Sequence, residues 1–198
     1  MTSLATHALA FANPVLDSQR VFRQVLTAMS RPGAPVVVAQ SLEPPAPLNA
    51  VSAAIALTLF DLDTKVWLDP EASTAAARAY LDFHCGCPSA LTRKDAAFAI
   101  LADPAGLAEL SSFSAGDPEF PDRSTTLVVQ VPALGRGKRL AFRGPGIKSV
   151  TETAIDGLPA DFVDLWAANH ALFPEGVDLV FAGPNAIVGL PRSTRVEG

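Results

Sequence analysis

An amphipathic helix is the first of several segments in which helical and strand periodicities alternate. Between residues 17 and 30 the apolar side chains recur at steps of one and three, which places them on one face of a helix. These side chains are Val21, Phe22, Val25, Leu26 and Met29. Gly33 follows the periodic segment and predicts its end. We therefore expect a helix that packs one face onto the rest of the fold.

Strand-like and helix-like segments then follow one another along the chain. A β-branched run at 35–39 predicts a strand, and the Ala- and Leu-rich stretch 48–59 predicts a buried helix. A second strand is predicted at 65–68. A helix over 71–83 is expected to begin near Pro70, because proline is tolerated in the first helical turn. This alternation predicts an α/β fold.

The second half continues the same pattern. The acidic segment 114–123 contains Pro and Gly and predicts a long loop that can act as a mobile flap. Gly135-Arg136-Gly137 predicts the turn of a hairpin with a basic tip. The remaining predicted elements are strands at 97–101, 125–131 and 139–142, helices near 105–110 and 162–168, and a closing hairpin of 178–181 with 186–190.

One domain over residues 1–198 is expected, since no internal repeat or low-complexity linker divides the chain. We expect a three-layer αβα arrangement around one mixed sheet, with a loosely ordered N-terminal arm over 1–13. Asp and Glu number 20 against 15 Lys and Arg, and the resulting charge of −5 disfavours nucleic acid and anionic membranes as partners. No apolar stretch is long enough to cross a bilayer, so a cytoplasmic protein is expected.

Cys85 and Cys87 are separated by one residue, a spacing at which a disulfide would be strained, so free thiols are expected. His84 beside them suggests a metal site, but structural zinc needs four donors and the chain adds only His7 and His170. We therefore predict no metal. The role of the two cysteines stays open.

Familiar catalytic motifs are absent from the sequence. Gly135-Arg136-Gly137-Lys138-Arg139 lacks the spacing and the hydroxyl residue of a phosphate loop, and no Gly-x-Ser-x-Gly elbow occurs. Gly144-Pro145-Gly146 predicts a tight turn whose N–H groups can form a small anion nest. No catalytic residue can be assigned from these patterns.

Arginines supply eleven of the fifteen basic residues, and several lie beside predicted turns. Guanidinium groups bind oxyanions through two parallel hydrogen bonds, so these positions are candidates for a ligand site. Surface salt bridges or a protein interface would use the same residues. The arginines beside turns are Arg31, Arg143, Arg192 and Arg195.

Short blocks in a constant order give the chain a family resemblance. They are Phe22-Arg23 with Leu26, Ala28-Met29-Ser30 and Pro32-Gly33; Leu57-Thr58-Leu59 with Asp61, Asp63-Thr64 and Val66-Trp67-Leu68; Phe83-His84; Thr126-Leu127; Leu140 with Gly144-Pro145-Gly146-Ile147; Phe173-Pro174 with Gly176-Val177-Asp178-Leu179; and Leu190-Pro191-Arg192-Ser193-Thr194. In these blocks the chain resembles the PhnH family of the bacterial carbon–phosphorus lyase system. It departs from the family pattern at Ser193, where Thr is usual.

The resemblance implies a fold related to the large domain of pyridoxal-phosphate-dependent transferases, without the cofactor. It also implies a non-catalytic but required subunit of the complex that makes alpha-D-ribose 1-methylphosphonate 5-triphosphate from ATP and methylphosphonate. The implied partners are PhnG-, PhnI- and PhnJ-like subunits. A homodimer is expected for the isolated chain, by analogy with two-fold-symmetric transferases.

Two alternatives remain open from the sequence. In the first, Arg31, Asp61, Arg192 and Thr194 form an oxyanion-binding site that takes a direct part in the reaction, with a phosphonate or nucleotide intermediate as ligand. In the second, the chain is a stand-alone transferase that binds pyridoxal phosphate. Its four lysines, which include no persuasive Schiff-base residue, disfavour the second alternative.

Overall fold

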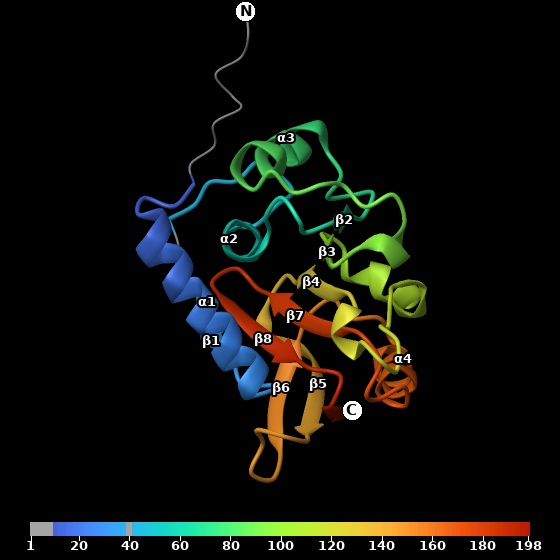
Figure 1. Cartoon of the computed structure of the whole chain (residues 1–198). Coiled ribbons are helices and arrows are strands. Elements are labelled where there is room, and N and C mark those ends of the chain that lie inside the picture. Colours follow the sequence, from blue (N-terminus) through green and yellow to red (C-terminus); the bar gives the residue numbers. More distant parts are fainter. Residues whose placement is uncertain (1–9, 39–40) are drawn as a thin grey trace, which may run out of the picture.

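A six-stranded mixed sheet forms the centre of the computed structural model, which describes residues 10–38 and 41–198 (Figure 1). Four neighbouring strands are parallel, and the two strands at one edge each run antiparallel to the strand beside them. In spatial order the strands are β1 (Val36–Val37), β8 (Ala186–Leu190), β7 (Asp178–Ala182), β4 (Thr126–Gln130), β3 (Phe98–Leu101) and β2 (Val66–Leu68).

Side chains alternate between the two faces of this sheet, as the two-residue repeat of a strand requires. In β4, Leu127 and Val129 belong to one hydrophobic core, whereas Val128 belongs to the other. In β7, Leu179 and Phe181 lie on the first side and Val180 on the second. Both faces are therefore buried, which explains why these strands are continuously apolar.

Three helices cover one face of the sheet: α1 (Pro14–Ser30), α2 (Ala50–Leu59) and α3 (Ala75–His84) (Figure 1). α2 is buried without interruption from residue 51 to 56, which explains its lack of a polar stripe. Asn49 caps α2 by accepting a hydrogen bond from the Ser52 N–H at 2.7 Å. The buried Gln130 side chain on β4 accepts bonds from the Asn49 N–H and the Ser52 hydroxyl, so it fixes α2 on the sheet.

The opposite face is covered by mixed structure rather than by helices alone. It carries α4 (Phe162–His170), the 3-10 helix η3 (Pro104–Ser112) and a second sheet of three strands. That sheet has the order β6 (Thr151–Ile155), β5 (Leu134–Arg143), β9 (Arg195–Glu197), and all its pairings are antiparallel. Two short 3-10 helices lie in connecting segments: η2 (Arg93–Asp95) precedes β3, and η4 (Pro121–Arg123) precedes β4. The α/β class and the mixed sheet are confirmed. The strands form two sheets, however, where a single sheet was expected.

The hairpin predicted around Gly135-Arg136-Gly137 is wrong. β4 belongs to the six-stranded sheet, whereas β5 belongs to the small one and pairs with β6 and β9. The three residues lie inside β5, where the register with β6 shifts between Leu134 and Lys138. The Gly-rich sequence therefore marks a β-bulge and not a turn.

Two helices begin at residues other than those predicted: α1 begins at Pro14 and not at residue 17, and α3 begins at Ala75 and not near Pro70. α3 begins after Thr74, whose hydroxyl caps it by accepting from the Ala77 N–H at 3.1 Å, and not near Pro70. Of the predicted arm 1–13, residues 1–9 lie outside the described part of the chain. Asn13 caps α1: its Oδ1 accepts from the Leu16 N–H at 3.1 Å, and its own N–H donates to Asp17.

Among the described helices, none has both the length and the apolar character needed to cross a bilayer.

Tyr80 on α3 is the single tyrosine of the chain, and its ring is almost completely buried. Burial raises the pKa of its hydroxyl from 10.0 to about 12, because the phenolate loses its hydration. We expect the near-ultraviolet tyrosinate absorbance of the native protein to titrate near pH 12, and that of the urea-unfolded chain near pH 10. Because the folded pKa is the higher one, stability should fall as the pH rises above 10. A native midpoint at 10 would contradict the burial of this ring.

Candidate functional site

A cavity of about 490 Å³ lies where β5 and β9 of the small sheet meet the end of α4. Its polar lining consists of two guanidinium groups, one imidazole, one hydroxyl and one carboxylate, and Pro145 and Phe173 add apolar surface. The polar residues are Arg143, His170, Ser193, Arg195 and Glu197. A volume of this size is typical of small-molecule sites.

Arg143 on β5 and Arg195 on β9 are direct cross-strand partners. The neighbouring pair, Phe142 with Val196, is buried in the core, so the two arginines extend from the opposite, outer face of the small sheet. Like charges at directly opposed positions repel each other. Glu197 offsets part of this repulsion, since its Oε2 lies 3.4 Å from the Arg143 Nε.

His170, in the last turn of α4, positions one of these arginines. Its Nδ1 lies 2.8 Å from the carbonyl oxygen of Arg192, and its Nε2 lies 3.3 Å from the Arg195 Nε. Because a carbonyl only accepts, Nδ1 carries the hydrogen, and the Nε2 lone pair accepts from Arg195. The imidazole therefore holds the Arg195 side chain by accepting from the Nε–H of the arginine. The two Nη groups of Arg195 have no partner among the described residues.

The loop between β8 and β9 forms one wall of the cavity. The Thr194 N–H donates to the Pro191 carbonyl at 2.8 Å, and the Thr194 carbonyl accepts from the buried Trp166 indole at 2.8 Å. Gly144 faces this loop closely: a Cβ atom at Gly144 would lie 3.0 Å from the Ser193 carbonyl oxygen. With its φ of +150°, Gly144 is a position that other residues rarely occupy. The predicted turn at 144–146 is confirmed, with the Ile147 N–H bonded to the Gly144 carbonyl.

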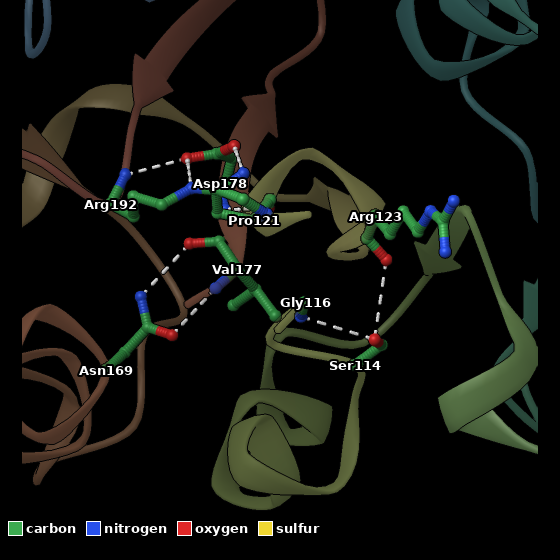
Figure 2. A network of polar contacts seen from close by, with 8 residues as sticks. All are labelled: Ser114, Gly116, Pro121, Arg123, Asn169, Val177, Asp178 and Arg192. Atoms are coloured by element: carbon green, nitrogen blue, oxygen red, sulfur yellow. Dashed lines mark hydrogen bonds and ion pairs between the residues drawn. The ribbon is translucent and has the colours of Figure 1, made fainter. Parts of the chain in front are cut away.

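Arg192, one of the two arginines of the predicted oxyanion site, forms its contacts inside the protein (Figure 2). Its Nη2 lies 2.5 Å from Asp178 Oδ2, its Nε lies 3.2 Å from Asp178 Oδ1, and its Nη1 donates to the Pro121 carbonyl at 2.6 Å. The two side chains are only 15% and 16% exposed. Arg192 therefore joins β7 to the 114–123 segment and positions His170 through its own carbonyl group.

The 114–123 segment, predicted as a mobile flap, has internal hydrogen bonds and a second point of attachment besides Arg192. The Ser114 hydroxyl accepts from the Gly116 N–H and donates to the Arg123 carbonyl (Figure 2). The Gly176 N–H donates to the Ala115 carbonyl at 2.8 Å. Nearby, Asn169 on α4 bonds both backbone groups of Val177. The segment is therefore joined to the residues before β7 through Ala115 and to Arg192 through Pro121.

The other predicted site residues lie apart from the cavity lining. Thr194 is fully buried in the loop wall, and its hydroxyl has no partner among the described residues. Arg31 is exposed at the end of α1. Asp61 lies in the turn after α2, where hydrogen bonds from the Thr64 hydroxyl and the Asp63 N–H lower the pKa of its carboxyl group. No described contact joins Asp61 to Arg31 or Arg192.

Cys85 and Cys87 are free thiols that interact with each other. Their hydrogen bond, together with burial, raises the pKa of Cys85, and the same hydrogen bond lowers the pKa of Cys87. Across residues 10–38 and 41–198, no three His, Cys, Asp or Glu side chains gather into a metal-binding group.

Comparison with known proteins gives matches over almost the whole chain. The family model described as bacterial phosphonate metabolism protein (PhnH) matches residues 9–197. The alpha-D-ribose 1-methylphosphonate 5-triphosphate synthase subunit PhnH of Rhizobium meliloti is 46% identical over 188 residues, which cover 95% of this chain and 94% of the relative. A putative C-P lyase subunit protein, HtxG of Stutzerimonas stutzeri, is 30% identical over 179 residues, or 90% of this chain and 85% of that protein.

Proposed function

We propose, because the chain belongs to the PhnH family of bacterial phosphonate metabolism proteins, that it is a required, non-catalytic subunit of a multi-subunit carbon–phosphorus lyase assembly. In this proposal the assembly makes alpha-D-ribose 1-methylphosphonate 5-triphosphate from ATP and methylphosphonate. The observation that carries the proposal is the match to a relative named as a subunit of that synthase, which extends over 94% of the relative.

An exposed apolar face on α1 supports a role inside an assembly. Val15, Phe22 and Leu26 are spaced by seven and four residues, so they lie on one side of the helix, and all three are exposed. Val37 on the neighbouring edge strand β1 is also exposed. Apolar side chains grouped in this way are typical of surfaces that another chain covers.

The pyridoxal-phosphate alternative finds no support in the placement of the lysines. A lysine that forms a Schiff base has to be desolvated so that its pKa falls. Lys65, Lys94 and Lys148 are exposed, and the Lys138 ammonium group donates to the Ala160 carbonyl at 2.6 Å. The residues present therefore do not fit a cofactor aldimine. A relation of the fold to the transferase large domain, over a single domain 1–198, remains part of the proposal.

The test is co-purification of the tagged chain with PhnG-, PhnI- and PhnJ-like proteins, followed by native mass spectrometry. We expect a stoichiometric complex, and a homodimer when the chain is purified alone. In an activity assay, the other subunits should lose synthesis of the ribose phosphonate when this chain is omitted, and regain it on addition. A chain that turns over ATP and methylphosphonate alone, or that binds none of the three partners, would overturn the proposal.

A further inference from the structure

The cavity at the end of the small sheet holds an excess of unused hydrogen-bond donors. Arg195 is bonded within the described residues through Nε alone, so both of its Nη groups remain available. Arg143 has one long contact, 3.4 Å from its Nε to Glu197. The hydroxyl of Ser193 has no partner among the described residues and lines the same space. A ligand that accepts several hydrogen bonds from different directions would match this set.

The charge of the cavity also favours an anion. Two arginines oppose one glutamate, and the cross-strand register places the two guanidinium groups on the same face. His170 accepts from Arg195, so it adds no positive charge in this arrangement. An anion between the arginines would relieve the repulsion that the register creates.

A series of hydrogen bonds from the protein interior fixes the orientation of the Arg195 side chain. Asp178 holds the Arg192 N–H and side chain, the Arg192 carbonyl holds His170, and His170 holds Arg195. This series of contacts begins at a largely buried ion pair and ends at the exposed arginine. A side chain held in one orientation loses less conformational entropy when it binds a ligand.

We propose that this cavity binds the phosphate or phosphonate group of a small organic anion, with Arg143 and Arg195 as its direct ligands. Guanidinium groups suit such oxyanions because each offers two parallel donors, and the Ser193 hydroxyl adds a donor from the loop wall. Phe173 and Pro145 provide apolar surface for the organic part. The choice of phosphate and phosphonate among oxyanions rests on the proposed function, whereas the choice of an anion rests on the cavity alone.

The experiment is isothermal titration calorimetry of the full-length chain, and of the complex it forms, with methylphosphonate and with inorganic triphosphate. We expect binding that weakens with added salt. Arg143→Met and Arg195→Met should each weaken it at least about tenfold, which corresponds to about 1.4 kcal/mol. Glu197→Gln should tighten it several-fold, because the competing carboxylate loses its charge. The preferred probe distinguishes a phosphonate from an oligophosphate as the ligand.

Arg136→Met is the matched control. Arg136 lies on the same strand β5 and has one exposed ion pair at 3.4 Å, like Arg143, but it does not line the cavity. Its substitution should leave binding unchanged. Equal effects of all three arginine substitutions, tighter binding without Arg195, or binding of neither probe by chain or complex would overturn the proposal.

Assembly of the same variants separates this proposal from the proposed function. If Arg195→Met co-purifies with its partners but loses the probe, both proposals stand. Loss of co-purification with retained probe binding would place Arg195 at a subunit interface and overturn the ligand site. Probe binding by a wild-type chain that joins no assembly would keep the anion site and remove the subunit function.

Discussion

Asp178→Ala is expected to lower the free energy of unfolding by about 3 kcal/mol, because it leaves a largely buried guanidinium group without its anion. Asp178 accepts bonds from the Arg192 backbone N–H at 2.7 Å and from the Nε and Nη2 groups of its guanidinium. Urea unfolding followed by tryptophan fluorescence measures the loss. Asp156→Ala, which removes the partner of the exposed Arg136, should change stability by less than about 1 kcal/mol.

The Arg192→Ala variant tests the same ion pair from its other side. If Arg192 were a ligand residue, its loss would reduce activity and leave stability unchanged. The structure predicts instead that Arg192→Ala lowers the free energy of unfolding. The double variant Asp178→Ala/Arg192→Ala should lose less stability than the sum of the two single losses. Additive losses would show that the two side chains do not interact in solution.

Gly189→Ala should destabilise the protein by about 2–3 kcal/mol through overpacking. A Cβ atom at this position would lie 2.5 Å from the Ala28 carbonyl oxygen and 2.8 Å from the Met29 nitrogen. Both are backbone atoms of α1, so a rotamer change cannot relieve the contact, and the helix has to move away from β8. For a chain of this size we expect the melting temperature to fall by roughly 4–12 °C.

Gly183→Ala, in the connection between β7 and β8, is the control for that substitution. Its new Cβ would meet the Leu134 side chain at 3.1 Å, and a side chain can shift by the few tenths of an ångström required. We expect a loss below about 1 kcal/mol. Equal losses at the two glycines would mean that α1 does not pack on β8 as closely as described.

Elements formed by local contacts could be predicted from the sequence. α1 could be recognised from its periodicity, although only Val21 and Val25 of the predicted stripe are buried and Phe22 and Leu26 are exposed. The β7–β8 hairpin joins neighbouring segments through Gly183-Pro184-Asn185. β5 could not be recognised in full, because its first half is polar and contains a bulge. Its partner β9 has only three residues, and the two strands meet through residues as far apart as 143 and 197. Pairings at such separations leave no periodic signal in the chain.

The candidate site shows the same limit. The sequence places Arg192 and Arg195 in one short loop, three residues apart, and both have the chemistry of an oxyanion ligand. Which of the two is engaged inside the protein depends on Asp178 and on Pro121, and neither contact can be inferred from local spacing. His170 belongs to no motif, and its role follows only from the meeting of α4 with the β8–β9 loop.

The position of β9 also sets the order in which the molecule can be completed during synthesis. β9 follows β8 along the chain, yet it pairs with β5, which precedes β7. A nascent chain can therefore complete its six-stranded sheet while the cavity still lacks Arg195 and Glu197. An anion bound between the arginines would stabilise only those chains in which β9 has docked on β5.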